Sequence, residues 1–284
     1  MENTLNYGYL PEEYSNPENS DIIIIPVAYD GTSTWVKGAN KGPEAIIDAS
    51  ANMELYDIDT DSEVYKRGIF TEGIIGGEIS TVEMIEAVFG NVKYYLDKDK
   101  FVIVIGGEHS VNIGSVKAYA QKYDDLTILQ LDAHADLRNE YNGSKYNHAC
   151  VMNRAKELCP IIQVGIRSMD VSEKDFMDKS RMFFAKDIYN NSDWIKNVIS
   201  QLSTNVYITI DLDVFDPSIM PSTGTPEPGG LLWYDVLDLM KNLFNKKNVV
   251  GFDVVELCPD GRNKAPDFLA AKLIYKLLSY KFKG

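Results

Sequence analysis

The five residues Asp132-Ala-His134-Ala-Asp136 carry the most chemical information in this chain. They follow the apolar run 126–131, which is typical of a buried strand. If the chain stays extended, Asp132, His134 and Asp136 point to one side, because alternate residues of a strand share a face. Two carboxylates and an imidazole gathered there would repel one another or go unsatisfied unless a cation lay between them. The motif therefore predicts a metal site where a strand ends.

Three further motifs with charged or imidazole side chains follow other apolar runs. In an open parallel sheet, ligands bind at the carboxyl ends of the strands. Four motifs in that one topological position predict a shared site more strongly than any single motif does. The further motifs are Gly106-Gly-Glu-His109-Ser110, Asp211-Leu-Asp213 and Asp253-Val-Val-Glu256, which come after the runs 101–105, 206–210 and 249–252. In the first, the two glycines allow a sharp exit from the strand and Ser110 is expected to cap the next helix.

Strand-sized apolar runs and helix-length segments alternate along the chain, and several runs are apolar on both faces. This pattern predicts the α/β class, namely a three-layer α/β/α sandwich around a mostly parallel sheet of about eight strands. We expect one domain, 1–284. The expected strands are 22–27, 101–105, 127–131, 161–166, 206–212 and 249–255, with weaker ones at 68–75 and 181–185. The expected helices are 81–96, 111–122, 149–158, 193–202, 231–244 and 266–281.

Charge and composition narrow the class of partner. The net charge of −14 over 284 residues disfavours nucleic acid and is compatible with a small cationic substrate. No apolar run reaches membrane-spanning length, and the first 20 residues lack the pattern of a secretory signal. Three cysteines give no disulfide framework and are expected to be buried small side chains. We therefore expect a cytoplasmic protein that binds neither membrane nor nucleic acid.

The predicted metal site has more ligands than one ion needs. Two divalent cations bridged by carboxylates would use all of them. Oxygen and imidazole ligands without a thiolate favour Mn²⁺ or Mg²⁺, and the imidazoles favour Mn²⁺ of the two; Zn²⁺, Fe²⁺ and Co²⁺ stay open. The six candidate ligands are His109, Asp132, His134, Asp136, Asp211 and Asp213.

With these motifs in place, the chain resembles the ureohydrolase family of arginases and agmatinases, and looks most like the agmatinases. The resemblance covers nearly the whole length. Besides the histidine and aspartate motifs above, it is carried by Asp30-Gly-Thr-Ser33, Gly38-Ala-Asn-Lys-Gly-Pro-Glu-Ala-Ile46, Asp211-Leu-Asp-Val-Phe-Asp-Pro217 and Thr223-Gly-Thr-Pro-Glu-Pro-Gly-Gly230. Glu108 departs from the aspartate common in the family, and we expect little effect from it.

The resemblance implies an arginase-like fold, two Mn²⁺ per subunit and a homo-oligomer, either a trimer or a hexamer. His148 matches the family's proton-relay histidine, and Glu256 matches the carboxylate that holds the guanidinium of the substrate. Asp136 is suited to take the proton of the attacking water. By the same resemblance, one ion is held by His109, Asp132, Asp136 and Asp211, and the other by Asp132, His134, Asp211 and Asp213.

The resemblance also bears on the substrate. Segment 137–147 does not match the arginase pattern, and Ser168 stands where arginases are expected to carry an acidic group. Both departures favour agmatine, which would be hydrolysed to putrescine and urea in polyamine biosynthesis. Another guanidino or formimino substrate, as in guanidinobutyrase or arginase, and a non-catalytic guanidine- or polyamine-binding subunit are the alternatives. For the distal amine of the substrate, Tyr29, Asp30 and Glu227 are the loop candidates.

Overall fold

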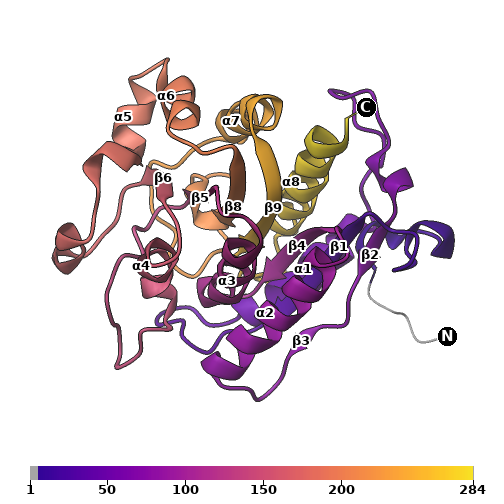
Figure 1. The fold of residues 1–284 in the computed structure, drawn as a ribbon, viewed down its shortest axis with the longest axis horizontal. Coiled ribbons are helices and arrows are strands. Elements are labelled where there is room, and N and C mark those ends of the chain that lie inside the picture. The colour runs from indigo at the N-terminus through magenta and orange to yellow at the C-terminus, as the bar shows by residue number, and fades with distance from the viewer. Residues whose placement is uncertain (1–5, 284) are drawn as a thin grey trace.

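A parallel sheet forms the centre of the computed structural model, which describes residues 6–283 (Figure 1). Its strand order is β2-β1-β4-β9-β8-β5-β6-β7, and β3 pairs with β1 beyond this path. Every pairing is parallel. The strands are β1 (Ile22–Ala28), β2 (Ile69–Thr71), β3 (Ile75–Gly76), β4 (Phe101–Gly106), β5 (Leu126–Leu131), β6 (Ile161–Ile166), β7 (Met182–Phe184), β8 (Asn205–Asp211) and β9 (Asn248–Val255).

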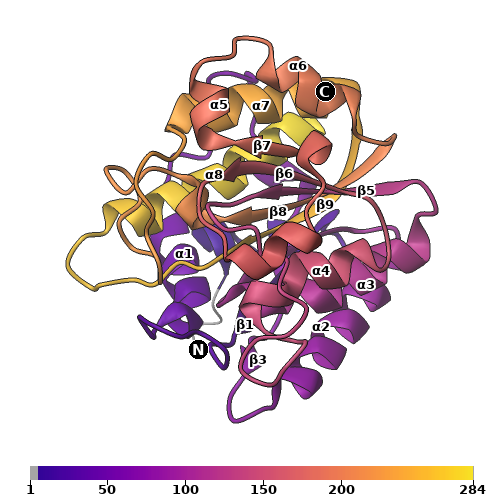
Figure 2. The same ribbon diagram turned by 90° about the vertical axis from the view of Figure 1, so that its left-hand side faces the viewer.

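Helices cover both faces of the sheet, as the alternating pattern predicts (Figure 2). The helices are α1 (Gly42–Ser50), α2 (Thr81–Leu96), α3 (Asn112–Lys122), α4 (Val151–Lys156), α5 (Ala185–Tyr189), α6 (Trp194–Ser200), α7 (Trp233–Lys246) and α8 (Ala265–Phe282). Along residues 6–283, none of them is long and apolar enough to cross a membrane.

Strand β1 shows why the apolar runs become central strands. Ile22 and Ile24 lie in the core on the side of α1, α6, α7 and α8, whereas Ile23 and Ile25 lie in the core on the side of α2, α3 and α4. All four are fully buried, because successive side chains of a strand point to opposite faces and both faces are covered. A continuous apolar run is therefore required here, and the sandwich architecture is confirmed.

Two helices are missing from the sequence-based expectation. The nine-residue α1 begins at Gly42-Pro43, a pair that reads as a turn but here occupies the first turn of a helix, where proline is tolerated. The five-residue α5 begins directly after β7, at Ala185, where the expected strand 181–185 ends, and the sequence predicts no helix over 186–189. Both helices are too short for their periodicity to stand out in the sequence.

The three cysteines are free. Cys150 and Cys258 are buried, and Cys159 is partly exposed. The expectation of buried small side chains is therefore correct for two of them.

Candidate active site

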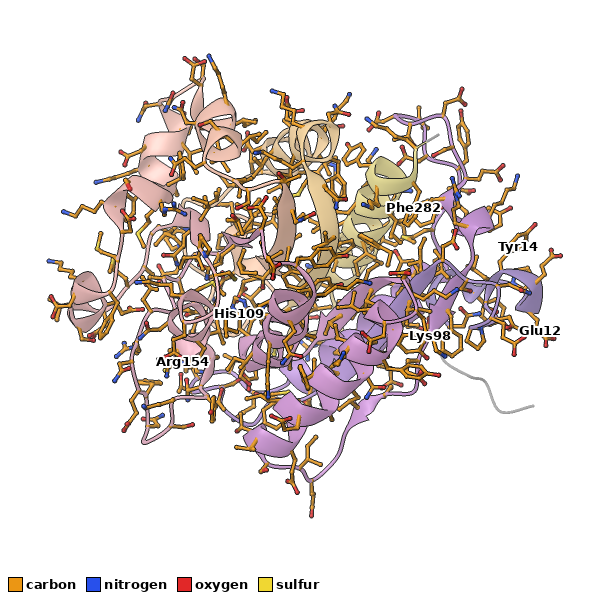
Figure 3. The ribbon with its side chains drawn as sticks, in the orientation of Figure 1. Glu12, Tyr14, Lys98, His109, Arg154 and Phe282 are labelled. Atoms are coloured by element: carbon orange, nitrogen blue, oxygen red, sulfur yellow. The ribbon has the colours of Figure 1, made fainter. Side chains whose placement is uncertain are left out.

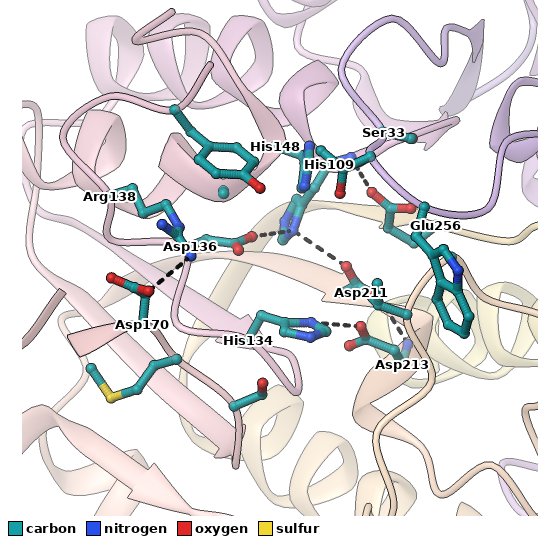
Figure 4. A pocket seen from close by; sticks show the side chains of 18 of the residues that line it. Ser33, His109, His134, Asp136, Arg138, His148, Asp170, Asp211, Asp213 and Glu256 are labelled. Atoms are coloured by element: carbon teal, nitrogen blue, oxygen red, sulfur yellow. Dashed lines mark hydrogen bonds and ion pairs between the residues drawn. The ribbon is translucent and has the colours of Figure 1, made fainter. Parts of the chain in front are cut away.

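The predicted site residues gather around one pocket at the carboxyl ends of β4, β5, β8 and β9 (Figure 4). In the whole molecule, His109 is buried, whereas Glu12 and Tyr14 lie at the right-hand edge of the view in Figure 3. The cavity has a volume of about 300 Å³. Its lining includes the predicted residues His109, His134, Asp136, His148, Asp211, Asp213 and Glu256.

His109 is held in a tight turn directly after β4. The turn leaves no room for a side chain at Gly107, since a Cβ there would lie 2.0 Å from the carbonyl oxygen of Tyr29. The prediction that Ser110 is the N-cap is wrong. The side chain of Glu108 caps the turn instead, because it accepts hydrogen bonds from the backbone nitrogen (2.9 Å) and the hydroxyl (2.6 Å) of Ser110. Glu108 is fully buried, so its carboxylate shapes the turn that presents His109.

Asp132 and Asp136 both reach His109, although not by strand alternation. β5 ends at Leu131, and Asp136 has a left-handed backbone with φ of 52°. The extended continuation that the sequence suggests is therefore wrong. The loop nevertheless places Asp132 Oδ2 at 3.2 Å and Asp136 Oδ2 at 3.1 Å from His109 Nδ1. A left-handed turn, and not strand alternation, therefore brings Asp132 and Asp136 together at His109.

Asp211 and Asp213 are brought to the same place from β8. Asp211 is the last residue of the strand, and its carboxylate accepts a hydrogen bond from the backbone nitrogen of Asp213 at 2.9 Å. This cap begins a short 3₁₀ turn, so the pair is not extended either. Asp211 Oδ2 lies 3.5 Å from His109 Nδ1, and Asp213 Oδ2 lies 2.8 Å from His134 Nδ1.

These side chains form two clusters with the geometry of metal ligands. His109, Asp132 and Asp211 form one, in which one ligand atom of each lies within 4.8 Å of the others. Asp132, His134 and Asp213 form the second by the same measure, so Asp132 belongs to both. His109 Nδ1 is buried and makes no hydrogen bond among the described residues, although three carboxylates surround it. A cation in the first cluster would satisfy this nitrogen, so the residues fit a pair of metal ions.

The pKa shifts of the side chains in the two clusters also favour bound cations. Burial raises the pKa of Asp211 well above its usual value, and the neighbouring Asp213 and Asp132 raise it further. Burial alone would lower the pKa of His109, but Asp132, Asp136 and Asp211 raise it well above its usual value. For His134, burial also acts to lower the pKa, but Asp213 and Asp132 raise it to about 12. Without a metal the site must hold protons in place of cations.

Glu256 lies beside this cluster, immediately after β9. Its backbone is left-handed, with φ of 69°, and its nitrogen donates to the carbonyl of Gly107 at 2.7 Å. The backbone nitrogen of His109 donates to Oε1 of Glu256 at 2.8 Å. Within the described part of the chain, Oε2 has no hydrogen-bond partner, and the residue lines the pocket. Burial raises the pKa of Glu256, and Glu108 raises it further, so this carboxylate favours a cationic partner.

His148 lines the same pocket from the loop before α4. Thr32 Oγ1 accepts from its backbone nitrogen at 3.0 Å and lies 3.1 Å from its Nδ1. Burial lowers the pKa of His148 to about 4, and the nearby positive charge of His109 contributes. The imidazole is therefore neutral near pH 7.

The pocket also contains an acidic residue, Asp170, that the sequence did not single out. Asp170 and Ser168 both line it, so the segment after β6 does carry an acidic group, two residues beyond Ser168. Asp170 Oδ2 lies 3.5 Å from Arg138, whose guanidinium lies 4.5 Å from the ring centre of Tyr141. The signal for Asp170 was its spacing from Glu173, which forms a capping box.

The loop candidates for the distal amine do not line the pocket. The hydroxyl of Tyr29 forms a hydrogen bond with Thr81 at 2.7 Å, and Asp30 accepts from the backbone nitrogen of Gly38 at 2.6 Å. Glu227 lies nearer, with Oε1 4.0 Å from His134 Nε2, but is absent from the lining.

Comparison with known proteins defines the class. The profile of the arginase family matches residues 20–279, and the chain belongs to this family. It is 36% identical over 280 residues to an N(1)-aminopropylagmatine ureohydrolase of Synechocystis, covering 95% of this chain and 92% of that one. An agmatinase of Pyrococcus horikoshii is 33% identical, with 92% of each chain covered. The crystal structure of an agmatine ureohydrolase of Thermoplasma volcanium superposes with a TM-score of 0.85 at 33% identity, covering 94% of this chain and 91% of that one. The protein is thus a ureohydrolase, a hydrolase that acts on amidino C–N bonds.

Proposed function

We propose that the protein hydrolyses agmatine to putrescine and urea with two Mn²⁺ per subunit. The observation that carries this proposal is the position of Glu256. A half-buried carboxylate with one free oxygen lies in the same pocket as the two ligand clusters. A guanidinium has only donors to offer, and a carboxylate is its natural partner.

The donor set supports manganese as the metal. The two clusters contain imidazoles and carboxylates and no thiolate, which favours Mn²⁺ over softer-ligand metals. The six predicted ligands would hold the pair, and Asp132 belongs to both clusters. When bound, the pair supplies Lewis acidity that makes a water nucleophilic near neutral pH.

The chain's own side chains divide the remaining work. Glu256 Oε2 would accept hydrogen bonds from the guanidinium and hold its carbon over the clusters. Asp136, which lies against His109, would accept the proton of the attacking water. The proton that Asp136 takes from the water would balance the one that the leaving amine gains, and His148, which is neutral near pH 7, would receive a proton before it donates one to that amine. The C–N bond to that amine then breaks, and urea and a primary amine leave the site.

The far end of the pocket supports a substrate with a cationic tail. Asp170 supplies a carboxylate there, and its Oδ2 lies 3.5 Å from the guanidinium of Arg138. An amine tail would be attracted by Asp170, whereas the α-carboxylate of arginine would be repelled by it. Because Asp170 lies two residues beyond Ser168, this segment does carry an acidic residue, and the serine at 168 no longer favours agmatine.

A second candidate substrate is N(1)-aminopropylagmatine, named in the Synechocystis relative. The structural feature that favours it is the exposed indole of Trp35 at the pocket, which offers an aromatic face to a longer cationic tail. Both substrates present the same guanidinium to Glu256, so they differ only beyond the first amine.

A substrate panel tests the proposal. The manganese-loaded protein would be assayed for urea with agmatine, N(1)-aminopropylagmatine and arginine at equal concentrations. We expect kcat/KM for agmatine to exceed that for arginine by about 100-fold or more. A higher kcat/KM for N(1)-aminopropylagmatine than for agmatine would favour the second candidate. Binding of two Mn²⁺ without urea from any guanidino compound would instead establish a non-catalytic binding protein.

A further inference from the structure

Behind His109, on the side away from the metal ligands, lies a chain of fully buried polar side chains. His109 Nε2 lies 2.9 Å from Thr209 Oγ1, and Thr209 Oγ1 lies 2.6 Å from Asp253 Oδ1. The other oxygen of Asp253 accepts from the hydroxyl of Tyr207 at 2.7 Å and from the side-chain amide of Asn112 at 2.7 Å. None of these five side chains is more than 1% exposed.

The sheet itself builds this chain of contacts. Thr209 on β8 is the direct partner of Asp253 on β9, so their side chains leave the sheet on the same face. Tyr207 lies two residues before Thr209 and shares that face. Asn112 is the first residue of α3, and its side-chain amide donates to the same carboxylate. The carboxylate of Asp253 is thus surrounded by hydrogen-bond donors.

Counting donors and acceptors fixes the direction of each hydrogen bond. The carboxylate of Asp253 accepts only, so the single hydroxyl hydrogen of Thr209 is committed to it. Toward His109, Thr209 can then only accept, which requires the hydrogen on Nε2 of the imidazole. In the neutral imidazole that can bind a metal, Nδ1 therefore carries the lone pair, and Nδ1 is the atom that faces Asp132, Asp136 and Asp211.

We propose that Asp253 is a positioning residue that acts through Thr209 to fix the tautomer of His109, so that Nδ1 can bind a metal. This role rests on the two-metal centre of the proposed function but concerns a residue that touches neither metal ligand oxygens nor substrate. A partner behind a ligating histidine raises its basicity and fixes its ring orientation. Here that partner is a relay of two side chains.

Asp253→Asn perturbs the relay at its origin. If the new amide turns its nitrogen to Thr209, that hydroxyl must accept and donates its hydrogen to His109 Nε2, which moves the imidazole hydrogen to Nδ1. If the amide turns its oxygen to Thr209, its nitrogen faces the side-chain nitrogen of Asn112, and the relay is kept only if Asn112 turns its unpartnered Oδ1 to accept it.

Two further variants and one control complete the set. Thr209→Val removes the relay atom with little change of shape, and Thr209→Ser restores the hydroxyl. Tyr207→Phe is the matched control. It removes a buried hydrogen bond to the same carboxylate, but the hydroxyl of Thr209 must still donate to Asp253. The thermal unfolding of each metal-free variant reports whether it is folded.

The test is a titration of the metal-free protein with Mn²⁺ alone, in which free Mn²⁺ is followed by electron paramagnetic resonance. We expect Asp253→Asn and Thr209→Val to weaken one of the two sites by about 10–100-fold, with the other site within about threefold. Thr209→Ser and Tyr207→Phe should leave both sites near the affinity of the unchanged protein.

Three results would overturn the inference. The first is unchanged binding at both sites in Thr209→Val, a variant in which no amide can turn to restore the relay. The second is a loss in Tyr207→Phe as large as that in Asp253→Asn, which would indicate general damage to the core. The third is that the unchanged protein binds fewer than two Mn²⁺, which would refute the metal centre of the proposed function along with the relay. If Asp253→Asn does not fold, the comparison of Thr209→Val with Thr209→Ser is sufficient to test the inference.

Discussion

Glu256→Gln should abolish most of the activity while leaving the metal ligands in place. The structure determines how the new amide must turn. The backbone nitrogen of His109 donates to Oε1 at 2.8 Å, so the amide oxygen has to stay there. The amide nitrogen then occupies the position of Oε2 and faces the pocket. A guanidinium also has only donors, so donor would face donor where an ion pair had formed.

The magnitude follows from two losses. A hydrogen bond to a charged group contributes about 1.5–3 kcal/mol, and a buried donor left without an acceptor costs about 1–3 kcal/mol more. The sum is about 2.5–6 kcal/mol, which at about 1.36 kcal/mol per decade of rate is a loss of roughly 10²–10⁴-fold in kcat/KM.

The assay is urea release at substrate concentrations below KM, with manganese content measured on the same samples. Glu157→Gln, an exposed carboxylate at the end of α4, serves as the control for the acid-to-amide change. A loss smaller than about threefold in Glu256→Gln with two Mn²⁺ still bound would refute the role of Glu256 in holding the guanidinium.

Because burial raises the pKa of Glu256, its charge destabilises the metal-free protein as pH rises above the usual carboxyl range. At pH 8, metal-free Glu256→Gln should therefore unfold at a higher temperature than the metal-free unchanged protein.

Further predictions concern the metals, the proton and the substrate tail. Asp132→Ala should lose metal and activity together, because Asp132 belongs to both clusters, and retention of two Mn²⁺ after gel filtration would contradict this. His148→Ala should keep both metals and lower kcat by about 10²-fold, so full activity would exclude a role for His148 in proton transfer. Asp170→Asn should raise KM for agmatine by about tenfold with little change in kcat, and an unchanged KM would place the amine tail elsewhere. Because carboxylates raise the pKa of His109 and His134, these groups must release protons when metal binds. The apparent Mn²⁺ affinity should then rise between about pH 6 and 8, by about one decade per pH unit for each proton released, whereas a flat profile in a competition titration would contradict the cluster.

The layers of the fold could be predicted because both faces of the sheet are buried. A run such as Ile22–Ile25 must be apolar at every position, and such runs are conspicuous in a sequence. Helix α1 escaped prediction because nine residues beginning at Gly42-Pro43 give too little periodicity.

The site residues could be predicted by type and topological position, whereas their local geometry could not. The approach of Asp132 and Asp136 to His109 depends on a left-handed turn at Asp136 and on the cap from Glu108, and no strand rule contains either feature. Asp170 was missed because its pairing with Arg138 joins two loops that are far apart in the sequence. Tertiary contacts of this kind leave little local signature.

The central claim is that this pocket hydrolyses a guanidinium with metal ions held by the two clusters. The most direct measurement is urea formation from agmatine by protein stripped of metal and then supplied with Mn²⁺ in increasing amounts. Activity should be absent in the stripped protein and should rise to a maximum as two Mn²⁺ per subunit are bound. Equal urea formation with and without metal, or none with two Mn²⁺ bound, would contradict the claim.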